Sequence, residues 1–160
     1  MAVHATLRAS SYISQVPIFQ FRGVSASSPY FSNNDDYDVI DELFYVYRAN
    51  VIHKQFNPDS DEDKFMSFLI LFVSKLIQEI NLNKYNKVQS KTYLNKLESN
   101  ITNELNTVYS GQTYSKEIEI YIKQIKTAIV ERFIELVYEK DEIDKFWAQF
   151  GYFHFAGKKL

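Results

Sequence analysis

The 160-residue sequence has no cysteine and little glycine or proline, with four glycines and three prolines. Without cysteine the chain can form neither a disulfide nor a thiolate metal site, and it has no thiol nucleophile. The sequence also contains no glycine-rich phosphate loop, nucleophile elbow or His-Glu metal motif. We therefore predict that the protein is not an enzyme, has no catalytic residues and binds no cofactor.

A basic excess and a long apolar run are also missing. The 18 basic and 20 acidic residues give a net charge of -2, whereas nucleic-acid-binding proteins usually carry a basic excess. The longest apolar stretch, residues 65–73, is less than half of what a membrane span requires. The first thirty residues lack the apolar core of a signal peptide. We predict no nucleic-acid partner and no membrane insertion.

One acidic run has the spacing with which a calcium-binding loop begins. Asp59, Asp61 and Asp63 alternate as in such a loop, but Lys64 and Ile70 stand where the loop needs Gly and Glu. An acidic helix start explains the run better, because carboxylates favour the positive end of the helix dipole. The three histidines are far apart in the sequence, so we predict no metal site.

Aromatic residues, by contrast, are abundant and make up 16% of the chain. Apolar residues recur at helical spacing over about 38–56, 60–80, 90–109 and 115–140. The apolar stripe of the last segment includes Leu136. Signals for strands are few. The sequence therefore predicts an all-α fold, with a single compact helical domain of about four to five helices.

The two ends of the chain differ from its helical middle. Residues 1–36 contain Pro17 and Pro29 and no helical period, which predicts an extended N-terminal arm. Residues 37–160 form the predicted helical domain, which ends in an aromatic C-terminal tail. The arm is too apolar to float free, so we expect it to lie on its own domain or on another chain.

The first predicted helix has more apolar surface than one core-facing stripe requires. Tyr45, Ile52 and Phe56 form a second row away from that stripe. Exposed apolar patches of this kind usually mark contacts with other molecules. Two explanations remain open: the arm and tail wrap the helices and cover the row, or another subunit covers it. Trp147 and Phe155 are the candidate anchors of the tail, for the core or for a partner.

The stretch "DYDVIDELFYVYRANVIHKQF", residues 36–56, resembles the first-helix block of the actin-related protein 2/3 complex subunit 3 family. The positions that fit the family block are Asp36, Asp38, Val39, Ile40, Asp41, Glu42, Tyr45, Tyr47, Arg48, Ala49, Asn50, Val51 and Lys54. The same register continues without a gap to about Ile80.

Further blocks follow in the family's order. "VHATL" near the start and "PIFQFRG" at 17–23 resemble the family's arm, and the last sixteen residues match its tail in spacing. The late helix is similar to the family's at Tyr121, Gln124, Ile125, Lys126, Arg132, Glu135, Val137 and Tyr138. The chain departs from the family over 83–117, which is shorter and has no proline, and at Tyr152 and Phe153, where the family is basic.

The resemblance implies a non-catalytic structural subunit of the seven-subunit complex that nucleates branched actin filaments. In that family this subunit packs against the actin-related protein 3 subunit and lies near the mother filament, in the cytoplasm and the actin cytoskeleton. Nucleotide is bound by the actin-related subunits, so none is expected here. The expected partners are actin-related protein 3, the other subunits and the actin filament.

From the pattern and the resemblance together we predict a set of interface residues. They are Tyr45, Arg48, Ile52, Phe56, Trp147, Phe150, Phe155 and Lys158. An alternative function is a stand-alone helical adaptor that binds a partner helix or peptide through an aromatic groove. The adaptor predicts a preformed groove in the isolated domain, whereas the assembly subunit predicts co-purification with actin-like proteins.

Overall fold

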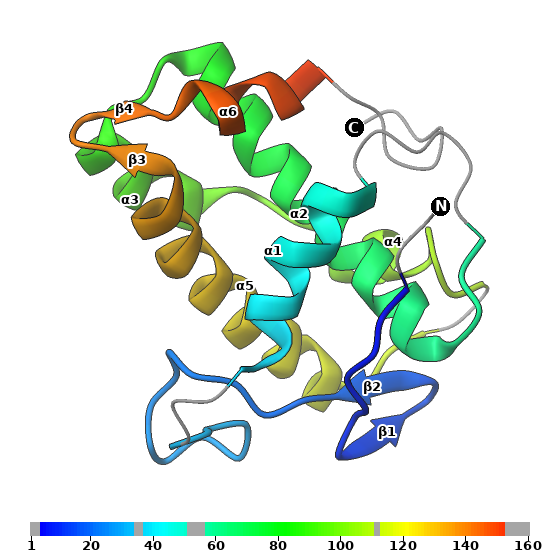
Figure 1. The fold of residues 1–160 in the computed structure, drawn as a ribbon. Coiled ribbons are helices and arrows are strands. Elements are labelled where there is room, and N and C mark those ends of the chain that lie inside the picture. Colours follow the sequence, from blue (N-terminus) through cyan, green and yellow to red (C-terminus); the bar gives the residue numbers. More distant parts are fainter. Residues whose placement is uncertain (1–3, 34–36, 51–56, 111–112, 153–160) are drawn as a thin grey trace.

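A computed structural model of the chain describes residues 4–33, 37–50, 57–110 and 113–152. Figure 1 labels its elements. They are β1 (Ser11–Ile13), β2 (Val16–Ile18), α1 (Val39–Asn50), α2 (Asp61–Asn83), α3 (Lys87–Tyr93), the 3₁₀ helix η1 (Leu94–Lys96), α4 (Ile101–Leu105), α5 (Lys116–Val137), β3 (Tyr138–Glu139), β4 (Glu142–Ile143), α6 (Lys145–Ala148) and the 3₁₀ helix η2 (Gln149–Tyr152).

The described chain is mostly helical, as the sequence predicts. It has six α-helices instead of four or five, because the predicted third helix is divided and the tail adds a short one. It also has two small antiparallel sheets of two strands each, which the all-α prediction omits.

The starts of the two longest helices follow from their capping residues. The Ser60 side chain accepts the N–H of Asp63 at 3.1 Å at the start of α2. The Ser115 side chain likewise accepts the N–H of Ile118 at 3.3 Å at the start of α5. Both boundaries therefore depend on local hydrogen bonds that the sequence specifies.

Helix α2 is the centre of the fold. It is long and apolar enough to cross a membrane by composition, but 61% of its most apolar 18-residue window is buried inside the protein. Phe65 of α2 stacks on Tyr121 of α5 with ring centroids 5.8 Å apart. Phe44 of α1 packs on Phe133 of α5 at 6.2 Å. Figure 1 shows α1 lying between α2 and α5, so the three long helices enclose one aromatic core.

The predicted helix over 90–109 is wrong as a single element. The chain forms α3 and η1, leaves the helical conformation at Leu97, and starts α4 at Asn100, whose side chain accepts the N–H of Asn103. Asparagine caps helices well and is a weak helix former, so the frequent Asn residues here favour short helices over one long helix.

The hairpin formed by β1 and β2 was missed because its turn has no glycine. Ser14 and Gln15 take left-handed φ values of 47° and 73°, which glycine and asparagine adopt more readily. The strands are held by tertiary contacts, since Val16 and Ile18 are buried and β2 packs on α2. Burial of these side chains therefore outweighs an unfavourable turn.

Residues 16–21 pack against the chain's own helices. Phe19 stacks on Phe65 of α2 with centroids 6.1 Å apart, and its backbone N–H donates to the Tyr121 hydroxyl at 3.0 Å. That hydroxyl donates in turn to the carbonyl of Pro17 at 3.2 Å. The described part of the predicted arm is thus fixed to α2 and α5.

The described part of the tail also packs inward. Trp147 and Phe150 are only 4% and 7% exposed. Their rings lie 6.1 Å and 5.7 Å from that of Tyr47 on α1. Asn81 of α2 donates to the carbonyl of Ala148 at 2.8 Å, which fixes α6 across the end of the long helices.

Candidate assembly surface

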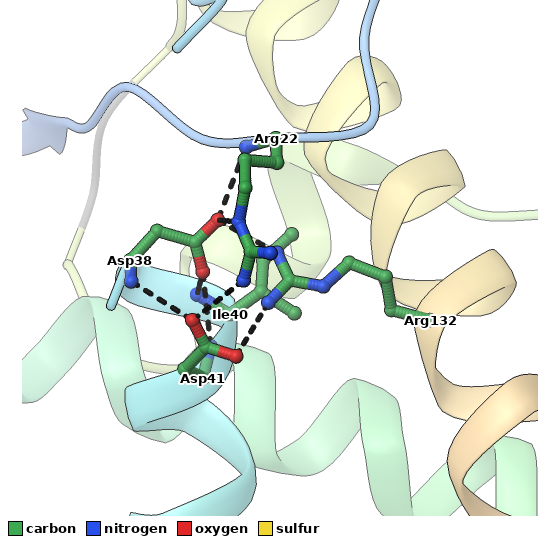
Figure 2. Close-up of polar contacts among 5 residues, drawn as sticks. All are labelled: Arg22, Asp38, Ile40, Asp41 and Arg132. Carbon is green, nitrogen blue, oxygen red and sulfur yellow. Dashed lines mark hydrogen bonds and ion pairs between the residues drawn. The ribbon is translucent and has the colours of Figure 1, made fainter. Parts of the chain in front are cut away.

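Two arginines and two aspartates join the N-terminal segment, α1 and α5 (Figure 2). Arg132 of α5 donates to Asp38 at 2.7 Å and to Asp41 at 2.6 Å. Arg22 donates to Asp41 at 2.8 Å through its guanidinium and to Asp38 at 3.0 Å through its backbone N–H. Asp38 also accepts the N–H of Ile40 at 3.0 Å, so it caps α1.

The environment of Asp38 keeps its carboxylate charged. Burial alone would raise the pKa of Asp38, but the hydrogen bond from Arg132 and the N–H groups of Arg22 and Asp41 outweigh burial and lower that pKa. Asp38 is 7% exposed, so loss of these donors would leave a buried charge without partners.

Two further carboxylates hold the first residues of the chain. Glu42 of α1 is 2% exposed and accepts the backbone N–H groups of Thr6 at 3.0 Å and Leu7 at 3.1 Å. Asp63 of α2 accepts the N–H of Ala5 at 2.6 Å. The stretches that carry the family resemblance therefore meet in space and fix one side of α1.

His4 lies beside Asp59 and Asp63, and these three side chains could hold a metal ion, with ligand atoms within 4.8 Å of one another. The oxygens of Asp63 already accept the N–H groups of Ala5 and Asp59. The His4 ring nitrogens lie 2.5 Å from Asp63 and 3.5 Å from Asp59. These contacts hold the N-terminal segment against α2, which accounts for the proximity of the three side chains.

The opposite side of α1 carries exposed apolar side chains. Tyr37 and Tyr45 are 55% and 54% exposed, and Leu136 of α5 is 45% exposed. With Phe44 and Arg48 they line an open groove of about 560 Å³. We call this surface, made by Tyr37, Phe44, Tyr45, Arg48 and Leu136, the α1 groove.

Arg48 is held flat against the edge of the α1 groove. Its Nε donates to the carbonyl of Phe44 at 3.3 Å, and its guanidinium carbon lies 5.8 Å from the centre of the Trp147 ring. A guanidinium over an indole is attracted by the ring's negative face. Trp147 thus orients the charge of Arg48 from inside the core.

A second groove of about 710 Å³ adjoins the first and shares Asp41, Phe44 and Leu136 with it. Its far wall is α3, where Lys87 and Lys91 pair with Glu135 of α5 at 3.2 Å and 3.4 Å. The hydrogen bond and charge of Lys87, with those of Lys91, lower the pKa of Glu135. Most charges of this second groove are therefore paired within the chain.

The predicted interface residues have different positions in the structure. Tyr45 and Arg48 lie on the α1 groove, whereas Trp147 and Phe150 are packed in the chain's own core. Outside the described residues lie Ile52, Phe56, Phe155 and Lys158. The part that any of these residues plays at an interface stays a prediction.

Sequence reasoning missed two members of the α1 groove. Tyr37 precedes the predicted helix and is not among the predicted interface residues. Leu136 was placed in the apolar stripe of its helix, and the structure corrects this assignment, since Leu136 is at the stripe's exposed edge. The available signal was the charged residues Arg132 and Glu135, four and one positions before Leu136, because charged side chains usually mark where the covered face of a helix ends.

Comparison with known proteins identifies the family. The family model described as "P21-Arc: ARP2/3 complex ARPC3 (21 kDa) subunit" matches residues 1–160. The chain belongs to this family. Its members are structural components of the complex and not enzymes, which agrees with the prediction from the sequence.

Relatives named "Actin-related protein 2/3 complex subunit 3" come from distant organisms. The protein of Saccharomyces cerevisiae is 28% identical over 88% of this chain and 84% of its own length. That of Schizosaccharomyces pombe is 26% identical over the same shares. That of Dictyostelium discoideum is 22% identical over 92% of this chain and 91% of its own. The resemblance seen in the sequence is thus confirmed at low identity and nearly full length.

Proposed function

We propose that this chain is an assembly subunit that packs against the actin-related protein 3 subunit and supports nucleation of branched filaments near the mother filament. Its contribution is positional, because it adds contact area and holds a neighbouring subunit in place. We place this subunit in the cytoplasm, within the actin cytoskeleton.

The α1 groove is the observation that carries this proposal. The described parts of the arm and the tail pack inward, yet Tyr45 and Leu136 remain about half exposed. Arg and Tyr beside an apolar centre are the residues that most often dominate protein–protein contacts. An exposed patch of this composition on the family's best-matched helix supports a contact with another subunit.

Co-purification tests the proposal. The tagged chain should retain actin-related proteins 2 and 3 from its own cells, identified by mass spectrometry. Tyr45→Asp should reduce this retention while the melting temperature changes little, because the side chain is 54% exposed. A wild-type chain that stays monomeric, with no actin-related partner, would contradict the proposed function.

The preformed α1 groove also favours the second candidate, a stand-alone adaptor for a helix or peptide. An adaptor would bind its partner as a free chain and would not co-sediment with the actin-related proteins. Sedimentation of a cell extract, with the chain followed by its tag, therefore separates the two candidates.

A further inference from the structure

We propose that the two adjoining grooves seat one amphipathic helix of a neighbouring subunit, whose apolar side bears a cation and a carboxylate about seven residues apart. This inference rests on the proposed function and names the kind of segment that the surface accepts. The charges that remain unpaired within the chain determine which residues such a helix must carry.

Most charges around the grooves already have partners. Arg22 and Arg132 are held by Asp38 and Asp41, at 2.6–3.4 Å between charged atoms. In the second groove Glu135 is held by two lysines. These ion pairs leave little net charge to attract a partner.

Two charges remain, one in each groove. Glu131 lines the second groove, is exposed, and makes no ion pair with any residue that the structure describes. Arg48 lines the α1 groove and makes no ion pair within the described ranges; it is held by the Phe44 carbonyl and the Trp147 ring. A partner with a cation opposite Glu131 and a carboxylate opposite Arg48 would satisfy both.

The apolar floor lies between these two charges. Phe44 and Leu136 line both grooves, and Tyr45 adjoins them. A partner must therefore be apolar between its two charged residues. An amphipathic helix meets this requirement when its apolar face lies in the groove and charged residues flank that face.

The seven-residue spacing of the two charges on the partner helix follows from how α1 and α5 lie against each other. Asp41 pairs with Arg132 and Phe44 packs on Phe133, so the two helices run in the same direction along this surface. Glu131 directly precedes Arg132, which pairs with Asp41, and Arg48 is seven residues beyond Asp41. At 1.5 Å per residue, Arg48 is therefore offset from the level of Glu131 by about 10 Å along the helix direction. An occupying helix spans that distance in about two turns, from residue i to residue i+7.

Site-specific photo-crosslinking in the reconstituted complex tests the inference. A benzoylphenylalanine at position 45 and one at position 136 should cross-link to the same helical segment of one subunit. Leu82 is the matched control, because it is 79% exposed but lines neither groove. Cross-links from 45 and 136 to different subunits, to a non-helical surface or to nothing would overturn the inference.

Charge reversal gives a second readout. Arg48→Glu and Glu131→Lys should each weaken the binding of this chain to the rest of the complex about tenfold, and reversing the facing charge of the cross-linked helix should restore it. Lys123→Glu is the control, since Lys123 is an exposed residue of α5 that lines neither groove. If wild type joins the complex and both variants bind as well as wild type, the helix-in-groove inference is wrong and the proposed function stands. If wild type does not join, the proposed function itself is wrong.

Discussion

Arg132 and Asp38 lie 2.7 Å apart although 94 residues separate them in the sequence. Their ion pair fixes the start of α1 to the C-terminal half of α5, and Asp38 is nearly wholly buried. A buried carboxylate that loses its partner is left with an uncompensated charge. The stability of the fold therefore depends on this contact more than on any exposed ion pair.

We expect Arg132→Leu to lower the free energy of unfolding by about 3 kcal/mol, because Asp38 keeps only Arg22 as a charged partner. Arg132→Lys should lower the free energy of unfolding by less, because lysine retains the positive charge. It should still lower it, because an ammonium group cannot bind both aspartates as the guanidinium does. Urea denaturation of the three proteins measures the difference. A leucine variant as stable as wild type would show that the pair contributes nothing.

Stability should fall at acid pH through Asp38. Its pKa is lower in the folded protein than the ordinary value of about 3.9, so its contribution is complete above that value and is lost as the pH falls through the folded pKa. Urea denaturation between pH 2 and pH 7 should show the decline. In Asp38→Asn the slope below pH 4 should be smaller, by up to about 1.4 kcal/mol per pH unit. An unchanged slope would assign the decline to other carboxylates.

The turn between β1 and β2 offers a stabilising change. Replacing Ser14 and Gln15 by Asn and Gly should raise the free energy of unfolding by about 1 kcal/mol, because both positions have left-handed φ values. Gln15→Ala is the control and should give no gain, since alanine does not favour this conformation. Thermal melting measures both, and a lower melting temperature for the Asn-Gly variant would contradict the expectation.

Lys126 and Glu104 form a partly buried ion pair, with Nζ and Oε2 2.5 Å apart. Burial lowers the pKa of Lys126 even though Glu104 acts in the opposite direction. Glu104→Ala should destabilise the fold by about 2 kcal/mol, because it leaves the lysine charge buried near Phe72. Adding Lys126→Met should recover most of the loss, as measured by urea denaturation. A double variant no more stable than Glu104→Ala would contradict this account.

The parts of the fold that depend on local chemistry could be predicted. The start of α2 follows from the Ser60 cap, and the extent of α5 follows from its apolar spacing and ends at Val137. The parts that depend on distant contacts could not. The β1–β2 hairpin has an unfavourable turn and exists because Val16 and Ile18 are buried. The helix predicted over 90–109 is divided where Asn100 caps the start of α4. Asparagine stabilises a helix start but is a weak helix former in the interior, and the apolar spacing alone does not show which of these effects is larger.

The candidate surface could be predicted in part. Tyr45 was found because it lies off the apolar stripe of its helix, which is a local property of the sequence. Leu136 was not, because a wide stripe does not show which of its edges a neighbouring helix covers. Trp147 could not be assigned to the core or to a contact, since an indole suits both and only its position against Tyr47 decides.

The hydroxyl of Tyr121 binds the backbone at Pro17 and Phe19, 102 to 104 residues earlier in the chain. A ribosome adds about 5 to 20 residues per second, so the arm emerges about 5 to 20 s before the helix that fixes it. During that interval the arm's apolar side chains lack the part of their docking site that α5 supplies and are open to chaperones. Nascent chains stopped before α5 should therefore remain unfolded, and this subunit becomes ready for assembly only after α5 has emerged from the ribosome.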